Sequence, residues 1–190
     1  MILFVAGLVL FFGIHSVAIF APAWRDAQAA RNERAWKGIY AVISLAGFVL
    51  LIYGYGIARQ SPVVVWSPPT FMRHVALLVM LPVFPLLLAA YLPGRIKAAA
   101  KHPMLLAVKF WALAHLLANG TLVDSILFGA FLVWVVLDRI AVKKRAVARA
   151  IPGAPPSKPN DAIALIGGLV LYGAFLMGIH RWLIGVSPLG

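Results

Sequence analysis

Residues 104–137 read MLLAVKFWALAHLLANGTLVDSILFGAFLVWVVL, and this stretch decides the fold class. It holds two charged side chains, and its polar break falls at Asn119–Gly120. A helix needs about 17–20 apolar residues to cross a hydrocarbon layer of about 30 Å. Residues 104–118 and 121–137 come close to that length on either side of the break. We therefore predict two transmembrane helices joined in a tight antiparallel hairpin.

Four further apolar segments flank this hairpin. Hydrophobic residues make up 63% of the chain and charged residues 12%, and the mean hydropathy is +0.96. Soluble domains are about 45–50% apolar and about 25% charged, so this composition excludes a soluble globular domain. We predict an all-α, polytopic membrane bundle of six transmembrane helices in one domain, residues 1–190. Pro82 and Pro85 are expected to interrupt one of them. The four further segments are residues 2–20, 39–57, 75–92 and 162–184.

Lys and Arg are distributed unevenly between the two ends of the predicted bundle. The loops after the first, third and fifth helices hold thirteen of them, against three at the opposite end. Cytoplasmic loops carry the excess of basic residues, so both termini are predicted to be non-cytoplasmic. The net charge of +12 is explained by these loops, and we expect no nucleic-acid partner.

The longest predicted cytoplasmic loop, residues 138–161, is basic and rich in proline. Its Pro-Gly-rich part, residues 151–159, predicts a semi-rigid or disordered connection rather than a domain. Its basic part, residues 143–149, is expected to lie against anionic lipid headgroups of the bilayer.

Histidine is the residue type that carries the candidate chemistry inside the membrane. The chain has no cysteine, which excludes thiolate ligands and disulfides. His15 and His115 are predicted at similar depths, roughly 10 Å and roughly 16 Å from the inner surface. Two imidazoles at similar depth among aromatic residues suit a bis-histidine haem in a bundle. Alternatively, each histidine donates a hydrogen bond to a neighbouring helix and serves only to hold the helices together.

Two neighbours of His115 are weaker candidates for the same site. Trp111 lies one turn before His115 and either stacks on a porphyrin or belongs to the apolar core. Asn119 lies one turn after it and either hydrogen-bonds His115 to orient its ring or ends the helix in a left-handed conformation. The residues leave both alternatives open.

Residues Lys101–Gly120 resemble the signature of the NnrU family, bacterial membrane proteins linked to nitrite and nitric oxide reduction and related to plant zeta-carotene isomerase. Three other stretches add to the resemblance: Phe12–Ser16, Ala21–Arg25 and His180–Pro188. The resemblance implies a protein of the bacterial inner membrane that binds haem b. It implies that His15 and His115 are the axial ligands of the haem iron. The plant enzyme has a cysteine near the position of Ala112, so its redox-dependent ligand exchange does not transfer.

Several functions therefore remain open from the sequence. The first is a redox or nitric-oxide-linked haem protein that serves denitrification or respiration. The second is a haem-dependent cis–trans isomerase of a carotenoid or other polyene or prenyl lipid. The third is a membrane methyltransferase, since Lys101–Pro103 is similar to an Arg-His-Pro motif of such enzymes. The fourth is an accessory protein without haem.

Overall fold

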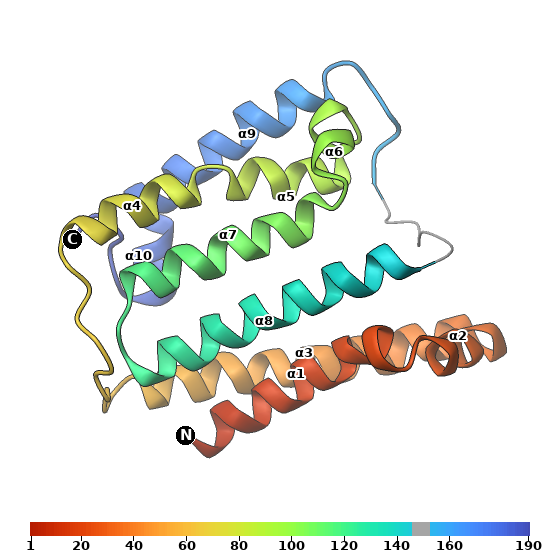
Figure 1. The fold of residues 1–190 in the computed structure, drawn as a ribbon, viewed down its shortest axis with the longest axis horizontal. Coiled ribbons are helices and arrows are strands. Elements are labelled where there is room, and N and C mark those ends of the chain that lie inside the picture. The colour runs from red at the N-terminus through yellow and green to blue at the C-terminus, as the bar shows by residue number, and fades with distance from the viewer. Residues whose placement is uncertain (146–152) are drawn as a thin grey trace.

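A computed structural model describes residues 1–145 and 153–190, and the described residues are organised almost entirely as helices (Figure 1). The all-α prediction is therefore confirmed. Arg149 and the residues around it, predicted to be part of a basic loop, lie outside the described residues. The helices are α1 Ile2–Phe20, α2 Pro22–Arg31, α3 Glu33–Ala58, α4 Phe71–Met80, α5 Val83–Tyr91, α6 Arg95–Ala100, α7 Pro103–Ala118, α8 Leu122–Lys144, α9 Asn160–Ala174, the π-helix η1 Phe175–Ile179 and α10 His180–Ile184.

Five helical segments of the described chain are long and apolar enough to cross a membrane. The sixth predicted segment corresponds to α7, which has 16 residues and is apolar but shorter than the others. At about 1.5 Å per residue, α7 is about 24 Å long. Six crossings therefore stay a prediction, as does the side on which the termini lie. The five segments are Ile2–Phe20, Glu33–Ala58, Phe71–Tyr91, Leu122–Lys144 and Asn160–Ile184.

Two charged stretches that were predicted as loops are helical, and this corrects the sequence prediction. Residues 22–31 form α2, and α3 begins at Glu33 rather than at residue 39. The Asn32 side chain accepts a hydrogen bond from the Ala35 N–H at 3.0 Å, which caps α3. Hydropathy detects the apolar part of a helix, so it misses polar turns that extend beyond the bilayer.

The short helix α6 was not predicted either, because its cap comes from a distant part of the chain. Asp161 accepts hydrogen bonds from the Arg95 N–H at 2.8 Å and from the Ile96 N–H at 2.9 Å. A carboxylate that accepts from the first amides of a helix stabilises its N-terminus. The start of α9 is thereby tied to the start of α6.

The predicted interruption at the two prolines is confirmed. The helix α4 ends at Met80, and α5 begins at Val83, directly after Pro82. Pro85 lies inside α5, where its missing N–H falls in the first turn and removes no helical hydrogen bond.

The predicted break at Asn119–Gly120 is confirmed as the turn between α7 and α8. The Gly120 carbonyl accepts hydrogen bonds from the Val65 and Trp66 N–H groups at 2.8 and 3.1 Å. A Cβ atom at position 120 would lie 1.9 Å from the Trp66 carbonyl oxygen. Glycine is therefore required where the segment before α4 crosses the end of the hairpin.

Glycines bring α1 and α3 into close contact along their length. A Cβ atom would lie 2.3 Å from the Leu51 nitrogen at Gly7, and 2.3 Å from the Phe4 nitrogen at Gly54. Helices in lipid gain no hydrophobic driving force from association, so small residues that allow close backbone contact stabilise their packing. Gly168 plays the same part between α9 and α5, where a Cβ atom would lie 2.3 Å from the Pro85 nitrogen.

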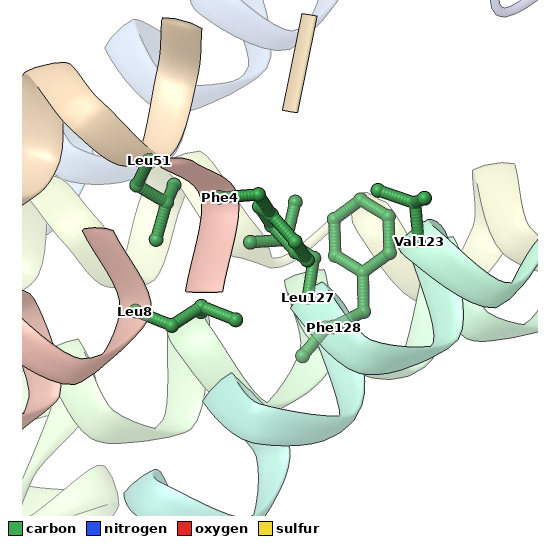
Figure 2. Close-up of a cluster of buried hydrophobic side chains, with 7 residues drawn as sticks. Phe4, Leu8, Leu51, Val123, Leu127 and Phe128 are labelled. Carbon is green, nitrogen blue, oxygen red and sulfur yellow. The ribbon is translucent and has the colours of Figure 1, made fainter. Parts of the chain in front are cut away.

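A hydrophobic cluster joins this helix pair to the α7–α8 hairpin (Figure 2). Phe4 and Leu8 of α1 point toward Leu127 and Phe128 of α8, and Phe4 is fully buried. The members of the cluster are Phe4, Leu8, Leu51, Ala112, Val123, Leu127 and Phe128.

The two ends of the bundle differ in charge. Both chain termini lie at one end, whereas α2, α6 and the C-terminal end of α8 lie at the other (Figure 1). The basic residues counted on the predicted cytoplasmic side, as far as the structure describes them, belong to α2, the start of α3, α6, the end of α8 and the adjoining loops. Which side of the membrane this end faces stays a prediction.

Substitution of Gly54 tests the close contact between α1 and α3. We expect Gly54→Ala to destabilise the protein by about 1–3 kcal/mol, because the new methyl group meets the backbone at Phe4. Gly56 lies on the same helix, and a Cβ atom there would have no neighbour within 4 Å among the described residues, so Gly56→Ala is the matched control. Thermal unfolding of the detergent-purified proteins, followed by circular dichroism, gives the unfolding midpoint of each variant. Equal midpoints for the two variants would contradict the packing described.

Candidate functional site

His115 lies on α7 inside an aromatic environment. Its ring stacks on Phe128 of α8, with the ring centres 4.5 Å apart, and the ring centre of Trp111 is 5.2 Å away. The His115 Nδ1 atom is 2.8 Å from the Trp111 carbonyl oxygen. A carbonyl oxygen only accepts, so Nδ1 donates the proton and Nε2 of the neutral ring carries a lone pair.

His15 on α1 is held in the same way. Its Nδ1 atom is 2.7 Å from the Phe11 carbonyl oxygen, one helical turn earlier. The ring lies among aromatic side chains, with ring centres 4.2 Å from Phe11, 5.2 Å from Tyr40 and 5.9 Å from Trp134. Its Nε2 atom therefore also has a lone pair to offer a ligand.

The structure does not bring His15 and His115 into contact with one another. His15 contacts α8 at Trp134, whereas His115 contacts α8 at Phe128. These two positions are six residues apart, which is about 9 Å along the helix axis. The predicted pairing of the two histidines on one iron stays a prediction.

His180 is the histidine that lies close to His115. The two ring centres are 6.4 Å apart, and the ring planes are within 25° of parallel. His180 begins α10, the last helix of the described chain, and its side chain is partly exposed. The contact with His115 was missed, because helix order alone does not show which helix ends meet.

Trp111 belongs to the aromatic core between α7 and α8. Its ring centre is 5.1 Å from those of both Phe128 and Phe131, and both pairs are edge-on. Phe131 also contacts Phe12 of α1, with ring centres 4.8 Å apart. These rings occupy the space along α8 between the level of His15 and the level of His115.

Asn119 contacts His115 through the backbone rather than the ring. Its Nδ2 atom donates to the His115 carbonyl oxygen at 2.9 Å. The backbone of Asn119 is extended, with φ −120° and ψ 143°, so the alternative of a left-handed helix end is wrong. The chain turns at Gly120 instead, and the ring of His115 is oriented by the Trp111 carbonyl.

The remaining two histidines lie away from this region. His74 is exposed in the first turn of α4. His102 is the N-cap residue of α7 and directly precedes Pro103, the first residue of that helix, where proline is favoured. Burial, and then the positive charge of Arg139, lower the pKa of His102 below its usual value.

A buried polar cluster at the end of the bundle near the termini was not predicted. Asp124 of α8 is 7% exposed and accepts hydrogen bonds from the Tyr55 hydroxyl at 2.5 Å and the Thr121 hydroxyl at 2.6 Å. The Arg59 guanidinium lies over the Tyr55 ring, 5.4 Å from its centre. An ionisable residue in a membrane helix indicates that a polar partner lies nearby. The sequence does not show which residue that is, because Tyr55 is 69 positions away from Asp124.

The fold and these residues define a multi-pass helical membrane protein with histidines in an aromatic interior. The family model described as NnrU protein matches residues 3–188, so the chain belongs to the NnrU family. The match covers nearly the whole chain and confirms the family resemblance found in the sequence. No curated protein and no solved structure matches the chain.

Substitution of Tyr55 tests the polar cluster. We expect Tyr55→Phe to lower the free energy of unfolding by about 1–3 kcal/mol, because the buried Asp124 carboxyl loses one of its two hydroxyl donors. Tyr53 lies on the same helix with its side chain exposed, so Tyr53→Phe is the control and should stay within about 0.5 kcal/mol of the parent. Denaturant unfolding followed by circular dichroism compares the two. Equal losses would show that the hydrogen bond to Asp124 contributes no stability.

Proposed function

We propose that this NnrU-family protein is an integral haem b protein of the bacterial inner membrane. We propose that it has a redox role or one linked to nitric oxide and denitrification, and that His115 is an axial ligand of the haem iron. The observation that supports this most directly is the hydrogen bond from His115 Nδ1 to the Trp111 carbonyl. Histidines that ligate metals use their other ring nitrogen in this way, because the bond fixes the tautomer and the orientation of the ring.

The residues present fit a haem better than a bare metal ion. The sequence has no cysteine, so the protein ligands to iron must come from other donors, of which imidazole is the most suitable. The described residues include no group of three or more His, Asp or Glu side chains that could hold a metal ion. Zinc sites need three or four protein ligands, whereas a porphyrin supplies four nitrogens and needs one or two.

The family resemblance names His15 as the second axial ligand, and its Nδ1 bond to the Phe11 carbonyl agrees with that role. When bound, haem b supplies one-electron chemistry or a binding position for a small diatomic ligand. The chain contributes the nitrogen ligands and an aromatic environment that excludes water. Burial of this kind shifts the reduction potential of an iron centre.

An absorption spectrum of the detergent-purified protein, before and after dithionite, tests this proposal. We expect a Soret band with sharp reduced α and β bands in the parent and in His74→Ala, which replaces an exposed histidine. We expect His115→Ala to lose or greatly reduce these bands, since it removes an axial ligand. A parent protein that stays colourless after haem reconstitution would contradict the proposal.

The alternative function, a haem-dependent isomerase of a polyene or prenyl lipid, is supported by the relationship of the family to zeta-carotene isomerase. An isomerase must open a coordination position on the iron for its substrate. Carbon monoxide binding by the dithionite-reduced parent protein would therefore favour the isomerase, or a role in nitric oxide binding, over electron transfer. A reduced spectrum unchanged by carbon monoxide would favour electron transfer.

We also propose six membrane crossings, with both termini outside the cytoplasm and the basic end at the anionic headgroups of the inner leaflet. The α7–α8 hairpin supports this, because α7 leads from the end that carries α6 back to the end that carries the termini (Figure 1). Lys109 is the one charged residue in the middle of α7, and its long side chain can reach the interface.

Reporter fusions test this topology. Alkaline phosphatase fused after Gly190 is expected to be active and green fluorescent protein at the same place dark, because the C-terminus is placed in the periplasm. Fusions to a chain truncated after Lys158 should give the reverse pattern and serve as the control. An inactive phosphatase at Gly190 would mean an odd number of crossings or the opposite orientation.

A further inference from the structure

We propose that a cavity of about 320 Å³ between the basic ends of α1, α2 and α3 binds the headgroup of one anionic phospholipid. Arg25 and Lys37 hold the phosphate, and the apolar wall of the cavity contacts the glycerol end of the lipid. None of the lining residues is a proposed haem ligand, so the inference does not depend on haem. The proposed orientation makes the lipid one of the inner leaflet. The residues that line the cavity are Ile14, Ala18, Arg25, Trp36, Lys37 and Tyr40.

The packing of α1 against α3 explains why a cavity lies here. Over most of this helix pair, glycines hold the two backbones in contact, and a Cβ atom at Gly47 would lie 2.6 Å from the Phe11 nitrogen. Beyond this contact, toward the basic end, the cavity lies between Ile14 of α1 and Trp36 and Tyr40 of α3. Two large aromatic side chains do not let the backbones approach as they do at Gly47, so space remains between the helices.

The helix α2 brings the first cation to this space. Ala21, which ends α1, and Asn32, which precedes α3, both have non-helical backbones. The chain therefore returns from α1 to α3 through α2, at the basic end of the bundle (Figure 1). Arg25 in the first turn of α2 lines the cavity, and its side chain is 28% exposed. Lys37 of α3 supplies the second cation.

Both cations have a carboxylate partner that a phosphate can replace. Arg25 pairs with Asp26 at 2.8 Å, and Lys37 pairs with Glu33 at 2.7 Å. The two carboxylate side chains are 56% and 67% exposed, and ion pairs at such exposure contribute little stability. A phosphate binds the planar guanidinium through two parallel hydrogen bonds. Residues 22–37 hold four basic and two acidic side chains, so this segment attracts anions even with both carboxylates in place.

The apolar wall favours a phospholipid over a free phosphate ion. Trp36 is 8% exposed and meets Trp24 edge-on, with ring centres 5.6 Å apart. Tryptophan side chains gather in membrane proteins at the level of the headgroups. A free phosphate would leave the wall formed by Ile14, Ala18 and Trp36 in contact with water, whereas the glycerol and first acyl carbons of a phospholipid cover it. Ligand pockets range from about 300 to 1,000 Å³, so this cavity suits a headgroup rather than a whole lipid.

Native mass spectrometry of the full-length protein in detergent tests the site. We expect the parent to bind one phosphatidylglycerol, which is anionic, in preference to phosphatidylcholine, which is zwitterionic. The double variant Arg25→Gln/Lys37→Gln should raise the Kd for phosphatidylglycerol by about tenfold or more, because two charge-assisted hydrogen bonds are lost. The matched control, Arg31→Gln/Arg34→Gln, removes the same charge from exposed positions that do not line the cavity. Its Kd should stay within about twofold of the parent value, because exposed charges are screened.

A second pair of variants tests the cavity without changing the charge. In Ala18→Phe the new ring occupies the cavity, so we expect phosphatidylglycerol binding to be lost although Arg25 and Lys37 remain. Ala27 lies exposed on α2 outside the cavity, so Ala27→Phe is the control. Circular dichroism identifies a variant that does not fold. The charge comparison is independent of this pair and stays valid if Ala18→Phe is unfolded.

Three results would overturn the proposal. Equal losses in the two charge variants would mean that the basic segment attracts anionic lipid without a specific site. Displacement of the lipid by inorganic phosphate at the same concentration would make this a site for soluble phosphate. A fall in haem content in Arg25→Gln/Lys37→Gln, with lipid binding unchanged, would assign the cavity to the haem. A parent protein without haem contradicts only the proposed function, because the lipid measurement needs no haem.

Discussion

The Trp111 carbonyl oxygen, one turn before His115, is the acceptor on which the proposed haem ligation depends. In hydrocarbon a polar N–H must find its partner within the protein, and His115 finds it in its own helix. That bond fixes which ring nitrogen keeps its lone pair. His15 and His180 obey the same constraint with the Phe11 and Val186 carbonyls. In each of the three rings a backbone carbonyl thus fixes Nδ1 as the donor.

The helix packing places these rings. Gly7 and Gly54 bring α1 and α3 together without bulky side chains between them, and the Phe4 cluster then fixes this pair against α8. The α7–α8 turn at Gly120 aligns His115 with Phe128. On the other side, Gly168 lets α9 approach α5, and the π turn after α9 directs His180 toward α7. Close backbone contacts between helices therefore determine the positions of the histidine rings.

Much of this fold is predictable from the sequence. A helix that crosses lipid must be apolar, and a break within it leaves backbone groups without hydrogen-bond partners. The boundaries of α1, the break before α5 and the turn at Gly120 follow from composition and from proline and glycine alone. The helices α2 and α6 do not, since they are polar and α6 is capped by a residue from a distant segment. His115 was predicted from depth and resemblance. Its contact with His180 depends on a π turn and on helix packing, neither of which hydropathy encodes.

Haem content is the measurement that tests the central claim most directly. The protein, expressed at full length in a haem-replete bacterium and purified in detergent, would be converted to its pyridine haemochrome and compared with its protein concentration. The account predicts haem b in a fixed ratio close to one per chain, with that ratio falling sharply in His115→Ala. Absence of haem from the well-folded parent protein, or equal haem in the two proteins, would contradict it.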